Sequence, residues 1–161
     1  MVAIQNKAGL VFEIIPYEDQ AADKLVSFYD LFEPKGEYQG IPPVQKHVRE
    51  RWIKEIKESW QNFLILRDDR VVGHVAVARE GGPLKELIIF LHQDYRGQGV
   101  GTKALGHIEG WLLEKGCKTL WLTVQNTNTP AIRCFRKVGF SFQSPLLEPE
   151  REMVLNLEKP K

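Results

Sequence analysis

The stretch of sequence that decides the fold spans residues 84–113 and reads LKELIIFLHQDYRGQGVGTKALGHIEGWLL. Apolar side chains fall on both sides of residues 84–91, which predicts a strand buried on both faces. Three glycines follow within residues 97–101, directly before a helical pattern whose apolar stripe runs to Leu112. A glycine-rich turn that leads into a helix leaves backbone N–H groups unpaired at the positive end of the helix dipole. The stretch therefore predicts strand, loop and helix around an anion site, most naturally for phosphate or pyrophosphate.

Two familiar glycine motifs do not fit this loop. A P-loop requires GxxxxGK[ST], and residues 97–103 lack that spacing. A dinucleotide-binding GxGxxG would need glycine where Thr102 stands, and its turn would follow the strand at once. The spacing that does fit is [QR]xxGx[GA], filled by Arg96, Gly99 and Gly101. On these six residues alone, an ordinary glycine-rich turn stays open as an alternative.

The loop resembles that of the GNAT superfamily of N-acetyltransferases, whose members use it to hold the pyrophosphate of coenzyme A. A second segment, residues 128–140 (NTPAIRCFRKVGF), resembles the family's Nxx(A)xxxYxxxGF helix. In the family the asparagine hydrogen-bonds the pantetheine arm and the helix packs against it. The clear resemblance covers about residues 84–140, with the strand-like KTLWLTV between the two motifs. The residues that agree in the second motif are Asn128, Ala131, Gly139 and Phe140.

The resemblance implies a cofactor, acetyl-CoA, and a set of residues that bind it. A backbone N–H near Leu91 would polarise the thioester carbonyl, and such a donor is worth ~3 kcal/mol of barrier where it faces the developing oxyanion. In the family the central strand also carries a bulge and splays from its neighbour, which opens a slot for the pantetheine arm. The cofactor residues are Leu91, His92, Arg96, Gly97, Gln98, Gly99, Val100, Gly101, Thr102, Asn128 and Phe135.

Phe135 is the main departure from the family pattern. It stands where many relatives have the tyrosine that protonates the departing thiolate, and phenylalanine has no proton to donate. Activity does not require that tyrosine, because a thiol with a pKa of ~8.5 is already a fair leaving group. Cys134 is an alternative donor, but its place on the inward stripe of the helix favours a packing role. The general acid stays unassigned.

Glu86 is the leading candidate for the catalytic base. An ammonium group has no lone pair, so an amine acceptor must lose a proton before or during its attack on the thioester. Glu86 lies on the predicted central strand, where related enzymes often carry a base that acts directly or through water. The competing interpretation is a polar residue at an exposed strand start. His92 and His74 are weaker candidates.

The loop of residues 33–43, EPKGEYQGIPP, is predicted to bind the acceptor. The resemblance implies that the loop between the first two helices lines the acceptor pocket. Its Glu33, Glu37 and Tyr38 would then favour a cationic amine, which enters between this loop and residues 144–151, SPLLEPER. The alternative is that Tyr38 simply covers the helices.

The remaining elements follow from hydrophobic periodicity and turn residues. A helix is expected over residues 43–60, with its interleaved basic and acidic residues as a solvated face. The last helix is expected to begin with Thr129 as its cap. Another helix is expected near residues 19–32. Further strands are expected near residues 10–17, 62–66, 71–78, 118–124, 140–143 and 152–157. Together they predict an α/β sandwich with a mixed sheet of about six to seven strands and about four helices.

Composition is consistent with one acetyltransferase domain over residues 1–161. Twenty-two basic and twenty-one acidic residues give a net charge of +1, which does not favour a nucleic-acid partner. The two cysteines have no CxxC spacing, so neither zinc nor a disulfide framework is suggested. The sequence shows no signal peptide and no apolar run of the ~20 residues that span a bilayer, so a cytoplasmic protein is expected, with a homodimer left open.

Two functions are compatible with this pattern. The first is an acetyl-CoA-dependent N-acetyltransferase that transfers acetyl directly to a primary amine of a small molecule or peptide. The second is a non-catalytic acyl-CoA-binding or sensing module of the same fold, which Phe135 favours because it cannot act as the acid.

Overall fold

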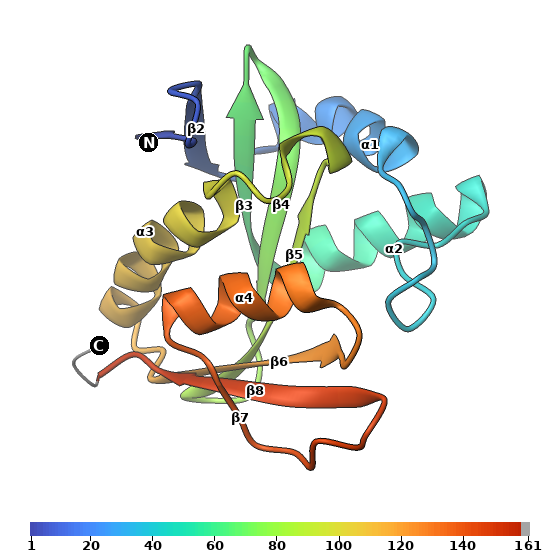
Figure 1. The fold of residues 1–161 in the computed structure, drawn as a ribbon. Helices are drawn as coiled ribbons and strands as arrows, with labels where there is room; N and C mark the ends of the chain where they lie inside the picture. The colour runs from blue at the N-terminus through green and yellow to red at the C-terminus, as the bar shows by residue number, and fades with distance from the viewer. Residues whose placement is uncertain (159–161) are drawn as a thin grey trace.

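The computed structural model of the protein describes residues 1–158, which form one eight-stranded mixed sheet with helices on both faces (Figure 1). The strand order is β1-β2-β3-β4-β5-β6-β8-β7. The strands are β1 Val2–Gln5, β2 Val11–Pro16, β3 Trp60–Arg67, β4 Arg70–Ala78, β5 Leu84–Leu91, β6 Thr119–Gln125, β7 Ser141–Phe142 and β8 Glu150–Asn156. The helices are α1 Ala22–Leu31, α2 Lys46–Ser59, α3 Val100–Glu114 and α4 Thr129–Val138, with short 3₁₀ turns at Asp19–Ala21 and Gln93–Tyr95.

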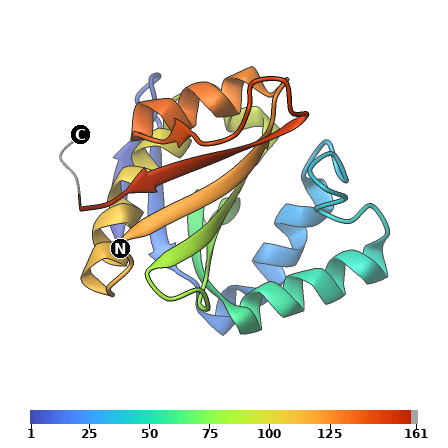
Figure 2. The ribbon, with the colours of Figure 1, turned by 90° about the horizontal axis from the view of Figure 1, so that it is seen from below.

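Each face of the sheet carries its own hydrophobic core. Helices α3 and α4 cover one face, and α1 and α2 cover the other (Figure 2). Strand β5 contributes to both cores, with Leu87 packing toward α3 and α4 and with Ile88 and Phe90 packing toward α1 and α2. The prediction of a strand buried on both faces is therefore confirmed. Within residues 1–158, no helix is both long and apolar enough to cross a membrane.

Strands β5 and β6 diverge in the middle of the sheet. Their parallel pairing covers only Leu84–Glu86 against Thr119–Trp121. Beyond Glu86, β5 continues alongside β4, whereas β6 stays paired with β8 as far as Gln125. The splay that the resemblance implied is present. The implied bulge is not found on β5: its register with β4 runs without a shift, and the irregularity lies between Ile65 and Leu66 in the β3–β4 pair.

The predicted α/β sandwich is confirmed, with eight strands instead of six to seven. The strand that the sequence did not predict is β1, which pairs at the sheet edge with β2 from Val2↔Ile14 to Gln5↔Val11. Four residues are too few for a periodic signal. Gly73 of β4 has no room for a side chain, because a Cβ added there would meet the Ile65 and Leu91 side chains, at 2.8 and 3.1 Å respectively.

Helix α2 begins at Lys46, three residues later than expected, and its basic residues are not all solvated. Arg49 is only 6% exposed, and its guanidinium lies 2.6 Å from the Asp30 carboxylate of α1. The same group donates to the carbonyls of Pro43 and Val44. Partial burial alone would raise the pKa of Asp30, but Arg49 and Lys46 lower it below its usual value. Arg49 was wrongly assigned to the solvated face, and it joins both helices to the end of the loop between them.

Candidate functional site

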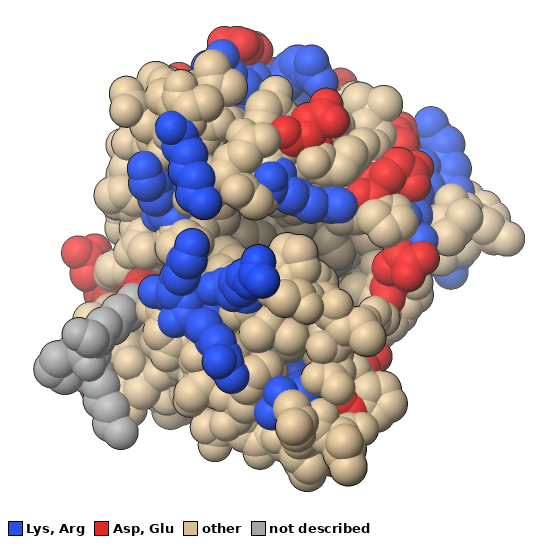
Figure 3. All heavy atoms as spheres, viewed as in Figure 1, with Lys and Arg blue, Asp and Glu red and all other residues tan. Residues whose placement is uncertain are grey.

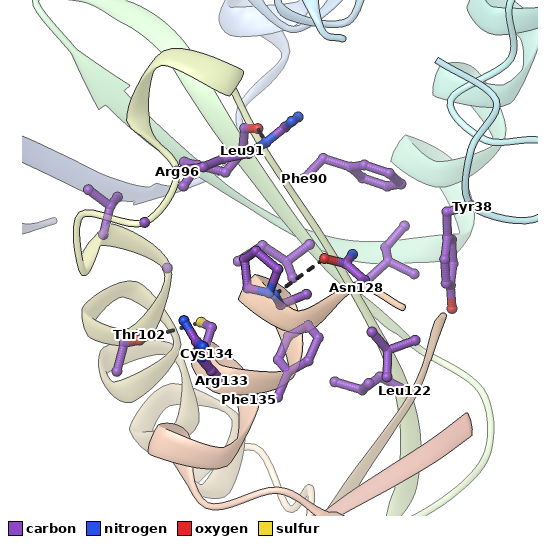
Figure 4. Close-up of a pocket in the computed structure, with 18 of the residues that line it drawn as sticks. Tyr38, Phe90, Leu91, Arg96, Thr102, Leu122, Asn128, Arg133, Cys134 and Phe135 are labelled. Atoms are coloured by element: carbon purple, nitrogen blue, oxygen red, sulfur yellow. Dashed lines mark hydrogen bonds between the residues drawn. The ribbon is translucent and has the colours of Figure 1, made fainter. Parts of the chain in front are cut away.

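A cavity of about 590 Å³ passes through the splay between β5 and β6 (Figure 4). It is lined from both faces of the sheet, so it connects the start of α3 with the α1–α2 loop. Figure 3 shows the hollow at the surface on the α3 and α4 side. The lining residues are Lys7, Phe32, Pro34, Glu37, Tyr38, Ile41, Leu87–Leu91, Arg96, Gly97, Gly99–Thr102, Leu122–Val124, Asn128, Pro130, Ala131, Arg133–Phe135 and Lys137.

One end of the cavity is an anion cradle. Gly97 and Gly99 have φ of 72° and 87°, a left-handed conformation that favours glycine, and Gly99 caps α3. By helix geometry, the first backbone N–H groups of α3 have no partner within the helix. A Cβ on Gly97 would meet no protein atom within 4 Å, so a ligand has room to approach the backbone there. These residues therefore fit a pyrophosphate group.

The cradle is held in place by the β1–β2 hairpin. The Lys7 backbone N–H donates to the Gln98 carbonyl at 3.0 Å, and the Asn6 side chain donates to the Gln98 side chain at 2.8 Å. Gln98 itself does not line the cavity, since its side chain also donates to the Asp94 carbonyl. The predicted role of Gln98 in the cofactor site is thus structural in this conformation.

Three cations that the sequence did not predict line the cavity near the cradle: Lys7, Arg133 and Lys137. Lys and Arg side chains gather above and below the hollow in Figure 3. Arg133 and Lys137 are four residues apart on α4 and share a helix face, which was the available sequence signal. Lys7 had no such sequence signal, because its position beside the cradle depends on strand β1, which was not predicted. The three fit a ligand with several negative charges.

Arg96 lines the cavity, but its guanidinium is engaged by two backbone carbonyls. Nε donates to Leu91 at 2.9 Å and Nη2 to Glu33 at 2.7 Å, and the group lies 4.8 Å from the Phe32 ring centroid. Burial lowers the pKa of Arg96 below its usual value. The side chain therefore ties the end of β5 to the α1–α2 loop, and the cradle itself is made of backbone.

The edge of β5 offers a backbone N–H, that of Leu91, to the cavity. The His92 N–H donates to the Val72 carbonyl of β4 at 2.8 Å. Antiparallel partners alternate between hydrogen-bonded and non-bonded pairs, so the N–H and C=O of the preceding Leu91 point away from β4. The bond from Arg96 to the Leu91 carbonyl agrees with this direction. The Leu91 N–H thus faces the gap left by β6, as the oxyanion role requires.

Helix α4 forms another wall of the cavity. Its cap is Asn128, whose side chain accepts from the Ala131 N–H at 3.4 Å, so the assignment of Thr129 as cap was wrong. Phe135 is buried and packs edge-on against Phe140 at 5.7 Å between ring centroids. Cys134 accepts a hydrogen bond from the Thr102 hydroxyl at 3.4 Å, and burial raises the pKa of its thiol.

The predicted catalytic and acceptor residues are only partly brought together. Glu37 and Tyr38 line the cavity, whereas Glu33 lies outside it and pairs with Lys35 at 3.1 Å. Glu86 is half-buried just below the splay, on the same side of β5 as Ile88, and burial raises the pKa of its carboxyl.

Neither candidate histidine lies in the cavity lining. The His92 ring accepts from the Asp94 N–H at 3.1 Å. His74 is 1% exposed and hydrogen-bonded to Tyr29 and Asn62, and burial lowers its pKa to about 3. Both therefore have structural roles. Glu86 does not line the cavity either, but it is the last residue of β5 paired with β6, directly before the cavity-lining residues 87–91, and its charge acts on Tyr38 in the lining, so it is the better placed base.

Three contacts tie the α1–α2 loop to β6 and to the C-terminal hairpin, across the predicted acceptor route. The Tyr38 hydroxyl bonds the Thr123 hydroxyl of β6, the Gln125 side chain donates to the Glu37 carbonyl at 2.5 Å, and the Gln39 side chain donates to Glu150 at 2.7 Å. The loop is thus fixed across the acceptor end of the cavity.

The splayed sheet and its cradle define the acetyl-CoA-binding class of α/β sandwich, and sequence comparison gives the family. The profile described as the acetyltransferase (GNAT) family matches residues 25–140. The chain belongs to this family.

The similarity to individual curated relatives covers only part of this chain. The [ribosomal protein bS18]-alanine N-acetyltransferase of Escherichia coli (strain K12) is 38% identical over 87 residues, which is 52% of this chain and 57% of the relative. The chain spans a quarter to just over half of the length of the curated relatives that it matches.

Solved structures confirm the fold. The GNAT domain of S. lividans PAT superposes with a TM-score of 0.83 at 15% identity, covering 96% of both chains. The putative acetyltransferase yncA of Salmonella typhimurium, solved with its cofactor acetyl-CoA, gives a TM-score of 0.68 at 16% identity and covers 92% of this chain and 95% of its own.

Proposed function

We propose that this chain is an acetyl-CoA-dependent N-acetyltransferase, built as one domain, that transfers acetyl directly to a primary amine of a small molecule or peptide. The observation that carries the proposal is the cavity through the splayed sheet, with an anion cradle at one end and Glu37 and Tyr38 at the other. Family membership and the names of the relatives as acetyltransferases support it.

Acetyl-CoA supplies the activated acyl group and a thiolate leaving group. The backbone of residues 97–102 binds the pyrophosphate, and Lys7, Arg133 and Lys137 add charge at the rim of the cavity. The Leu91 N–H donates to the thioester carbonyl, where negative charge develops.

Glu86 takes the proton of the attacking amine, directly or through water. Burial raises its pKa, which makes the carboxylate a stronger base than an exposed glutamate. Asn128 and Phe135 line the pantetheine path from the α4 side.

A non-catalytic acyl-CoA-binding module is the second candidate. Two observations favour it: Phe135 has no proton to donate, and the α1–α2 loop is fixed across the acceptor end by Tyr38, Gln39 and Gln125. Such a module would bind acetyl-CoA through the same cradle and release no thiol.

A thiol-release assay separates the two candidates. The protein is incubated with acetyl-CoA and a panel of amines, and free thiol is followed with and without acceptor. We expect release above the no-acceptor rate with at least one amine, and a ~10²-fold or greater loss of kcat in Glu86→Gln with unchanged acetyl-CoA affinity. Tight acetyl-CoA binding by calorimetry together with no amine-dependent release across the panel would favour the binding module instead.

A further inference from the structure

Tyr38 is held rigidly at the end of the cavity opposite the cradle. Its backbone is fixed by a tight turn, since Tyr38 and Ile41 exchange two backbone hydrogen bonds of 3.3 and 2.8 Å. The flanking residues are fixed as well, Glu37 by Gln125 and Gln39 by Glu150. A ring that merely covered the helices would not need this support. The hydroxyl is therefore preorganised against Thr123, at the border of the gap.

The acyl carbon has to lie in the gap between β5 and β6. The cradle is on the α3 and α4 face of the sheet, the α1–α2 loop is on the other face, and the cavity joins them only through this gap. Glu86, Ile88 and Phe90 share the face of β5 that packs toward α1 and α2. Tyr38 reaches the same side from the loop, and Figure 4 shows it across the cavity from Phe135, with Leu122 between them.

Few proton donors are available at this point. Among the described residues that line the cavity, the side-chain donors are Lys7, Tyr38, Arg96, Thr102, Thr123, Asn128, Arg133, Cys134 and Lys137. Three of these are the rim cations, Arg96 is engaged by two carbonyls, and Asn128 caps α4. Thr102 and Cys134 bond each other at the start of α3. Tyr38 and Thr123 remain on the acceptor face, and a phenol is a far stronger acid than an aliphatic hydroxyl.

We propose that Tyr38 is the general acid of the transfer, which protonates the departing thiolate in place of the tyrosine that Phe135 replaces. This role rests on the proposed acetyltransferase function. As the amine nitrogen forms its bond to the acyl carbon, its proton passes to Glu86. As the carbon–sulfur bond breaks, the thiolate takes the phenolic proton of Tyr38. The phenolate recovers a proton from the Glu86 carboxylic acid, directly or through the Thr123 hydroxyl and water, so that one proton has moved from nitrogen to sulfur.

The electrostatics of the site are compatible with this route. Burial raises the pKa of Tyr38, the hydrogen bond with Thr123 opposes that shift, and the charge of Glu86 adds to it. The hydroxyl therefore stays protonated at neutral pH, as an acid must before each turnover.

The test compares Tyr38→Phe with Thr123→Val. Both variants remove the same hydrogen bond and keep the shape of the side chain, but only Tyr38→Phe removes the phenol. Thiol release is measured with the best amine and, independently of any acceptor, as the slow hydrolysis of acetyl-CoA. We expect Tyr38→Phe to lower kcat by ~10²-fold in both assays. Thr123→Val should lower it by only about fivefold, the effect of one lost hydrogen bond.

A second tyrosine provides the rescue. Adding Phe135→Tyr to Tyr38→Phe places a phenol on the α4 side of the same cavity, and recovery of ~10-fold or more in kcat would support the acid role. Equal losses in Tyr38→Phe and Thr123→Val, or a rise in acceptor KM with kcat unchanged, would overturn it. If the wild-type protein releases no thiol above buffer, while calorimetry shows that it binds acetyl-CoA, the proposed function is lost and the role of Tyr38 with it.

Discussion

At the scale of single residues, His74 sets a pH limit on the fold. Its Nε2 lies 2.8 Å from the Asn62 side-chain oxygen, which can only accept, so Nε2 carries the proton and Nδ1 accepts from the Tyr29 hydroxyl. The Asn62 amide is oriented by its own donation to the Ile56 and Trp60 carbonyls. This network joins α1, β3 and β4.

Protonation of His74 is coupled to unfolding. Its pKa is about 3 in the folded protein because burial disfavours the charge, whereas an unfolded chain restores the usual ~6.5. The stabilising contribution is complete above pH ~6.5, and each pH unit below that removes ~1.4 kcal/mol of unfolding free energy until the folded pKa is reached. When the free energy of unfolding is measured with urea at pH 7 and at pH 5, it should fall less between the two pH values in His74→Gln than in the wild type. The control is His47→Gln, an exposed position on α2, which should keep the wild-type pH dependence.

At the scale of elements, α3 offers a matched pair of glycines. Gly99 begins the helix and Gly116 follows its end, and both have φ of 87°. A side chain is strained to a similar degree at either position, at a cost of about 1 kcal/mol or more. Only Gly99 lies in the cradle. The two positions therefore separate helix stability from ligand binding.

We expect Gly99→Val to abolish acetyl-CoA binding and Gly116→Val to leave it unchanged. The measurement is calorimetric affinity, with the unfolding midpoint of each variant recorded beside it. Gly101→Val should also abolish binding, with tighter packing as an added cost, since a Cβ there meets the Cys134 sulfur at 3.4 Å. Wild-type affinity in a folded Gly99→Val protein would remove the cradle from the site.

The contrast between α3 and its surroundings shows what the sequence could predict. Residues 84–113 carry their own signals, because a buried strand, a glycine turn and an amphipathic helix are each encoded in contiguous residues. The ties that complete the site join distant parts of the chain: Tyr38 to Thr123 across 85 positions and Arg96 to Glu33 across 63. Periodicity carries no information about such pairs. Lys7 escaped prediction for the same reason, since it reaches the cradle through an edge strand of four residues.

At the scale of the whole molecule, the cavity separates charge along its length. Basic side chains surround the end that faces α3 and α4 (Figure 3). At the opposite end, Glu37 of the α1–α2 loop is the one carboxylate among the described lining residues, and Glu150 of β8 accepts a hydrogen bond from the neighbouring Gln39. A cationic acceptor would be attracted to the end that a cofactor phosphate avoids. Because Glu37 is exposed, its carboxylate would steer such an acceptor more than hold it.

Glu37 and Glu33 allow this steering to be measured. Both are exposed and lie four residues apart in one loop, but only Glu37 lines the cavity, while Glu33 is paired with Lys35 at 3.1 Å. Glu37→Gln should raise the acceptor KM and leave the acetyl-CoA KM almost constant, whereas Glu33→Gln should change neither. The difference should shrink as salt is added, because charges are screened over ~8 Å at physiological ionic strength. Equal effects of the two substitutions, or a neutral acceptor used as efficiently as any amine cation, would show that the acceptor is selected by contacts other than charge at this end of the cavity.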